Sequence, residues 1–73
     1  MKQHYLTEQK IRNMGIVLNI ISQGKVLELN KLKGLLFDQF MMTPELTEKY
    51  LKNLKVMGKI EIDEKNNEVW MKV

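Results

Sequence analysis

Apolar residues follow two different spacings along the chain, and the change between them falls at Gly58. Before Gly58 they recur every three or four residues, which predicts amphipathic helices, whereas after it they alternate with polar residues, which predicts strands. Gly24 and the pair Thr43-Pro44 divide the helical part into three, because glycine commonly ends a helix and proline is favoured in the first turn of one. The spacing therefore predicts an α+β fold.

The expected elements follow from these boundaries. They are a helix at 7–23, a short strand at 25–29, helices at 31–40 and 44–57, and strands at 59–63 and 68–73. Thr7, Asn30 and Thr43 are the predicted N-caps, and Asn66-Asn67 suits a tight turn between the last two strands. The residues expected to face the core are Ile11, Met14, Val17, Leu18, Ile21, Leu32, Leu35, Leu36, Phe40, Leu46, Tyr50, Leu54 and Met57.

With 73 residues the chain is interpreted as a single domain, 1–73. Domains of this size usually need a disulfide, a metal or a partner for stability, and the sequence has no cysteine and only one histidine, His4. A homodimer is therefore expected. Ile16 and Ile20 lie on the side of the first helix away from its core-facing stripe, and together with Tyr5 they form the predicted dimer interface. In the alternative reading, the N-terminal arm with Tyr5 folds back over the two isoleucines.

The residue types present argue against an enzyme. The chain has no cysteine, and its single serine, Ser22, has no histidine within the predicted fold to act as its base. No glycine-rich phosphate loop occurs either. No catalytic residue, metal or cofactor is therefore expected. Without a long apolar run or a signal-peptide core, the chain is expected to be cytoplasmic and to have no membrane partner. A net charge of +3 favours a polyanionic partner modestly.

The order helix, strand, helix, helix, strand, strand resembles the winged-helix variant of the helix-turn-helix domain. The most specific stretch is 43–60, in which Leu54, Gly58 and Ile60 match the family's leucine, three residues, glycine, any residue, isoleucine exit from the third helix into the wing. The chain is similar to small regulators of archaeal viruses and plasmids. The resemblance implies a double-stranded DNA-binding protein that regulates transcription by promoter occupancy, with the third helix in the major groove.

The resemblance also implies where DNA would be contacted. The expected DNA-binding residues are Lys49, Lys52, Asn53, Lys55, Thr47, Lys31, Lys33, Lys65 and Asn66. Glu45 and Glu48 oppose this expectation, because carboxylates on the third helix repel phosphates. In the alternative reading the lysines form a solvated helix face with Glu48 and Lys52 as an i,i+4 pair, and the domain docks a protein partner without binding DNA. The salt dependence of binding distinguishes the two readings.

Overall fold

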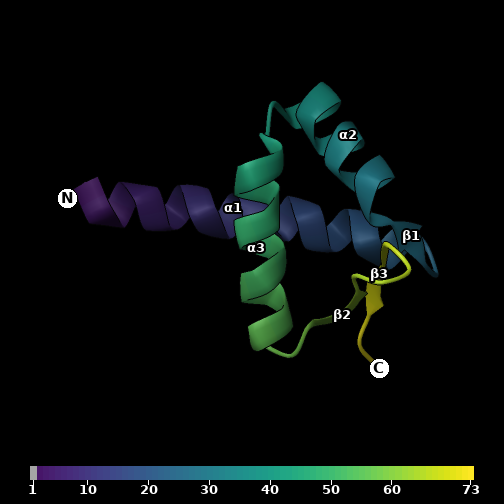
Figure 1. The fold of residues 1–73 in the computed structure, drawn as a ribbon. Helices are drawn as coiled ribbons and strands as arrows, with labels where there is room; N and C mark the ends of the chain where they lie inside the picture. Colours follow the sequence, from purple (N-terminus) through teal and green to yellow (C-terminus); the bar gives the residue numbers. More distant parts are fainter. Residues whose placement is uncertain (1) are drawn as a thin grey trace.

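A computed structural model describes the backbone of residues 2–73 and the side chains from residue 8 onward. Its elements are α1 (Lys2–Gln23), β1 (Leu27–Glu28), α2 (Leu29–Phe40), α3 (Pro44–Val56), β2 (Ile60–Asp63) and β3 (Glu68–Met71) (Figure 1). The predicted α+β fold and the predicted order of its elements are confirmed.

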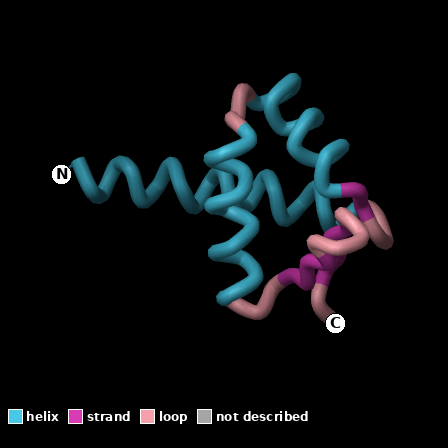
Figure 2. The backbone as a smooth tube through the Cα atoms, in the orientation of Figure 1, coloured by secondary structure: helices cyan, strands magenta, loops and turns pink. Residues whose placement is uncertain are grey.

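Helix α3 crosses α1 and stands on the outside of the molecule. Helix α2 lies beside the N-terminal part of α3, and the strands lie near the C-terminal end of α1 (Figure 1). The N-terminal turns of α1 project beyond the other elements (Figure 2), which gives the molecule an elongated outline of 40 × 26 × 21 Å. Within the part of the chain that the structure describes, no helix combines the length and the apolar character needed to cross a bilayer.

The three strands form one antiparallel sheet in the order β1-β3-β2. Ile62 lies opposite Val69 and Ile60 opposite Met71, so these four side chains share the face that packs on the helices. Ile60 and Val69 are buried, while Ile62 and Met71 pack against the core from its edge. The predicted alternation of inward and outward residues in β2 is therefore confirmed.

The core is assembled from all three helices and the hairpin. The amide Nδ2 of Asn13 in α1 donates to the Tyr50 hydroxyl of α3 over 3.0 Å, which adds a polar link between these helices. The buried apolar residues are Val17, Ile21, Leu29, Leu32, Leu36, Met42, Tyr50, Leu51, Leu54, Ile60 and Val69.

Two of the three predicted N-caps are wrong. Helix α1 already begins at Lys2, so Thr7 lies inside it. Helix α2 begins at Leu29 instead of after Asn30, because the buried Leu29 donates its backbone N–H to the Asn67 carbonyl over 2.8 Å. This tertiary contact sets the start of the helix, and it leaves β1 with two residues instead of five. The Thr43 cap is confirmed, since its Oγ1 accepts from Leu46 N–H at 3.2 Å.

Four residues predicted to face the core are exposed instead. Ile11 is 64% and Met57 57% exposed, and the other two are Leu35 and Phe40. Ile11 lies on α1 before the turns that contribute to the core, and Met57 follows the last turn of α3. The apolar stripes of these helices thus extend past the neighbours that could cover them.

Candidate nucleic-acid interface

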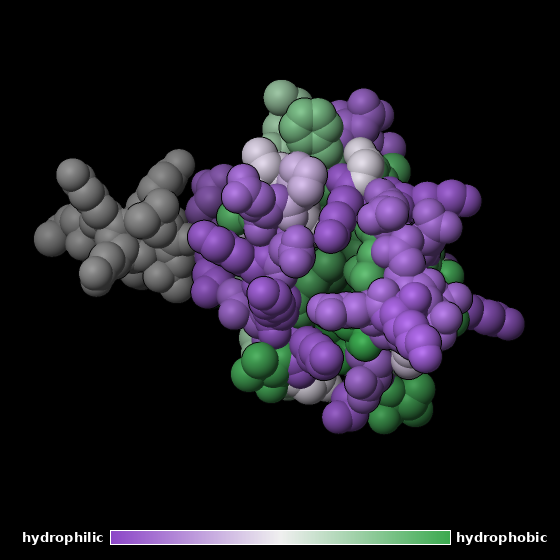
Figure 3. Space-filling view, viewed as in Figure 1, coloured by the Kyte–Doolittle hydropathy of each residue, from purple (hydrophilic) through white to green (hydrophobic). Residues whose placement is uncertain are grey.

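The outer face of α3 carries a short stripe of lysines. Its inner face is fixed by Tyr50, Leu51 and Leu54, which are buried. Lys49 and Lys52 lie three residues apart on the opposite face and are exposed. Side chains gathered over α3 in this view are mostly hydrophilic (Figure 3). The helix therefore presents an outward charged surface, on which the lysines lie beside the exposed Glu45 and Glu48, and it is held from behind by α1 and α2.

One ion pair joins α3 to α2 at the edge of this face. Lys33 Nζ lies 3.5 Å from Glu48 Oε2, with 25% of the lysine and 55% of the glutamate side chain exposed. Glu48 thus pairs across the helices, and the predicted i,i+4 pair of Glu48 with Lys52 does not form. The pair lies in a groove of about 250 Å³ between α2, α3 and the hairpin, lined by Leu29, Lys33, Glu48, Leu51, Lys52, Ile62, Glu64 and Asn67.

The tip of the hairpin is closed by its own side chains. The Asp63 carboxylate accepts from Asn66 Nδ2 at 2.7 Å and from the Asn66 backbone N–H at 3.2 Å. These two hydrogen bonds lower the pKa of Asp63 below its ordinary value of 3.8. The turn spans four residues, 64–67, with Asn67 at φ +60°. The predicted strand bounds, 59–63 and 68–73, leave the same four residues between them, and Asn67 has a positive φ, as predicted for the Asn66-Asn67 pair. Asn66 uses its amide inside the turn, and both Asn66 and Lys65 are exposed.

Two predicted DNA-binding residues lie off the basic face. Thr47 is completely buried, so its assignment as a DNA contact is wrong: three residues before Tyr50, it points into the core with that side chain. Asn53 is half-buried and lines a groove between α1 and α3. Lys55 is exposed on α3, and its role in DNA binding stays a prediction.

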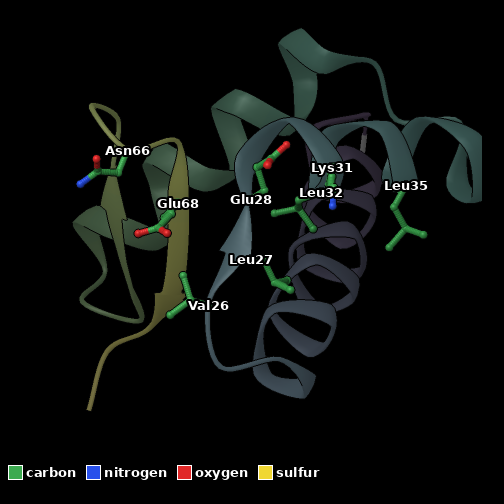
Figure 4. Close-up of a pocket in the computed structure, with 8 residues that line it drawn as sticks. All are labelled: Val26, Leu27, Glu28, Lys31, Leu32, Leu35, Asn66 and Glu68. Atoms are coloured by element: carbon green, nitrogen blue, oxygen red, sulfur yellow. The ribbon is translucent and has the colours of Figure 1, made fainter.

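Lys31 and Lys33 point to different sides of α2. Lys31 lies in a second groove of about 540 Å³, opposite the hairpin residues Asn66 and Glu68 (Figure 4). Glu28 lies directly across from Glu68 in the antiparallel pairing of β1 and β3, so two carboxylates share this groove with Lys31. Only Lys33 reaches the groove beside α3. The structure therefore does not bring the two lysines together.

The described residues contain no cluster of histidine, cysteine and carboxylate side chains that could hold a metal ion. Glu28 and Glu68 are two neighbouring carboxylates in one groove. Lys31 lines the same groove, and its positive charge would repel a bound cation. This part of the chain offers charged surfaces and not a coordination sphere.

Sequence reasoning missed an apolar groove of about 520 Å³ between α1 and the end of α3. It is lined mainly by Ile11, Met14, Leu18, Val56 and Met57. Ile11, Met14 and Leu18 follow helical spacing, a signal that reads equally well as a core stripe. Nothing in the spacing shows that α3 ends before it covers them.

The predicted dimer residues have other surroundings. Ile16 and Ile20 are half-buried and pack against the core, so they do not form an open apolar face on the far side of α1. The Tyr5 side chain lies outside the described side chains. Among the side chains of α1 that the structure describes, from residue 8 onward, the open apolar surface is instead the one that carries Ile11.

Comparison of the chain with protein families, with curated proteins and with solved structures finds no match in any of the three.

Proposed function

We propose that the protein is a winged-helix protein that binds double-stranded DNA and regulates transcription by occupying promoter DNA. Helix α3 is the recognition helix in this proposal. The observation that supports it is the exposed stripe of Lys49 and Lys52 on the outward face of a helix whose other face is buried.

The dimensions of α3 suit this role. A helix of 13 residues is about 20 Å long, and the major groove of B-DNA admits a helix. Lys55 extends the positive charge along α3, and Lys65 places a further charge at the hairpin tip. Ammonium groups at these positions would attract phosphates independently of sequence.

Salt-dependent binding tests the proposal. Fluorescence anisotropy with a random-sequence duplex at about 50 and 200 mM salt should show binding that weakens steeply as salt rises. Lys52→Ala should weaken binding and reduce the log–log salt slope by about one. Lys25→Ala removes an exposed lysine outside α3 and should leave both quantities nearly unchanged. Absence of wild-type binding at the lower salt would contradict the proposal and favour a protein-docking module.

A second copy of the chain is the partner we propose for the apolar groove between α1 and α3. Ile11, Met14 and Leu18 supply an apolar stripe along α1, and Gly15 between them leaves open space where a side chain would stand. Glycine has no side chain to hold another helix away, so a second helix can approach the stripe closely there. A twofold dimer would present two α3 helices to a pseudo-palindromic site.

Light scattering tests the dimer. The wild type should have twice the mass of one chain, and Ile11→Lys should return it to the mass of one chain. Val26→Lys is the matched control, because Val26 is also an exposed apolar residue but lies outside this groove. Equal masses for the two variants would contradict this interface.

A further inference from the structure

The groove between α2, α3 and the hairpin contains as many carboxylates as ammonium groups. Lys33 and Lys52 line it together with Glu48 and Glu64. A phosphate entering beside α3 would meet both signs of charge. Although the outer face of α3 is basic, its edge toward the hairpin is electrically balanced.

Glu48 differs from Glu64 because it forms an ion pair with one of the two lysines, Lys33. Its Oε2 lies 3.5 Å from Lys33 Nζ. Lys33 is also the less exposed partner, with 25% of its side chain accessible. A phosphate that approaches the Lys33 ammonium meets the Glu48 carboxylate beside it, which repels the phosphate and already neutralises part of the positive charge of the ammonium.

We propose that Glu48 limits sequence-independent DNA binding by competing with phosphates for Lys33. The inference rests on the proposed DNA-binding function. Phosphate contacts supply most of the affinity for DNA of any sequence, whereas contacts to base edges distinguish one sequence from another. A carboxylate that reduces the phosphate contribution therefore leaves binding more dependent on base contacts. Glu48 acts as a specificity-determining residue of the α3 face.

Glu45 provides a matched control on the same helix. It is an exposed glutamate one turn before Glu48, and within the described part of the chain it belongs to neither of the ion pairs. It does not line the groove. Replacing it with glutamine removes the same charge from α3 without releasing a lysine. Exposed ion pairs contribute little to folding stability, so both glutamine variants should retain the circular dichroism spectrum of the wild type.

The experiment measures binding of a random-sequence duplex by anisotropy across the same salt range. Glu48→Gln should raise affinity about fivefold at the lower salt and steepen the log–log salt slope by about one, as expected for one additional phosphate contact. Glu45→Gln should raise affinity less and leave the slope closer to that of the wild type. With Lys33→Ala in the background, the gain from Glu48→Gln should fall to that of Glu45→Gln.

Two results would overturn the inference while DNA binding itself stands. The first is an equal effect of the two glutamine variants on affinity and slope. The second is a gain from Glu48→Gln that persists undiminished in the Lys33→Ala background. A wild type that does not bind the duplex at the lower salt would instead overturn the proposed function, and the inference with it.

Discussion

The hydroxyl of Thr47 lies in the core of the molecule, and within the described residues it has no hydrogen-bond partner. A buried polar group without a partner costs free energy. Thr47→Val keeps the shape of the side chain and removes that group. We expect the variant to increase the free energy of unfolding by about 1 kcal/mol, as measured by urea denaturation.

The same variant tests the placement of Thr47. Because the side chain is buried on the inner face of α3, Thr47→Val should leave DNA affinity unchanged. If the variant folds at least as stably as the wild type but binds DNA more weakly, Thr47 contacts DNA and its placement in the core is wrong.

Asp63 and Asn66 give the hairpin turn a defined pH dependence. The hydrogen bonds from the Asn66 side chain and backbone favour the charged carboxylate and lower the pKa of Asp63. A lowered pKa means that the stabilising contribution is complete above the unfolded-state pKa of about 3.9. It is lost as pH falls through the lower pKa of the folded state.

Asn66→Ala should therefore raise the pKa of Asp63 toward its ordinary value, which an NMR titration of the carboxyl carbon would measure. The variant should be less stable than the wild type near about pH 6, and the difference should shrink near about pH 2. An unchanged Asp63 titration in Asn66→Ala would show that the side-chain hydrogen bond does not cause the shift.

At the scale of the elements, Gly58 ends α3 and directs the chain into β2. Its φ is +77°, a left-handed conformation that glycine adopts without the steric cost borne by other residues. Gly58 N–H donates to the Lys55 carbonyl, and Lys59 N–H donates to the Leu54 carbonyl, each over 3.0 Å. This pair of bonds is the Schellman arrangement that satisfies the last carbonyls of a helix.

Alanine substitutions at two glycines should have opposite effects. Gly58→Ala should lower the free energy of unfolding by about 1 kcal/mol or more, because alanine is strained at positive φ. Gly34→Ala should raise it by up to about 1 kcal/mol, since Gly34 lies inside α2 with open space around its Cα. Thermal or urea denaturation measures the free energy of unfolding of both variants. A change in the same direction for both would contradict the left-handed conformation of Gly58 or the helical conformation of Gly34.

Capping residues, proline and the spacing of apolar residues predicted correctly those helix and strand boundaries that depend only on neighbouring residues. The Thr43 cap, Pro44 at the start of α3 and the period-two spacing of β2 all appear as the sequence indicates. Tertiary contacts determine the rest. The start of α2 depends on the bond from Leu29 to Asn67, and no residue near Leu29 signals that contact.

The candidate site was predictable only in part for the same reason. Lysines at three-residue spacing identify the exposed face of α3. Spacing alone does not show that Thr47 lies on the buried face, which it shares with Tyr50 and Leu54. The Lys33–Glu48 pair joins residues 15 positions apart, so it exists only after α2 and α3 have packed together.

At the scale of the whole molecule, the Asn13–Tyr50 hydrogen bond joins α1 to α3 at the edge of the core. Tyr50 is buried, and its hydroxyl accepts from the Asn13 amide. Tyr50→Phe keeps the ring in place but leaves that amide without its acceptor. We expect the free energy of unfolding to fall by about 1 kcal/mol.

Asn13→Ala should cost a similar amount, and the double variant should cost less than the sum of the two. Urea denaturation of the three variants measures this coupling. Strictly additive losses would show that the bond does not contribute to the contact between α1 and α3.

The bond from Leu29 N–H to the Asn67 carbonyl also has a mechanical consequence. It joins the hairpin turn, with Lys65, to the N-terminal end of α2, where Lys31 and Lys33 are the third and fifth residues of the helix. A ligand that pulled on the turn would therefore load the end of a helix through this bond. We expect the hairpin turn and the start of α2 to move together, so that a displacement at Lys65 reaches Lys33 beside α3.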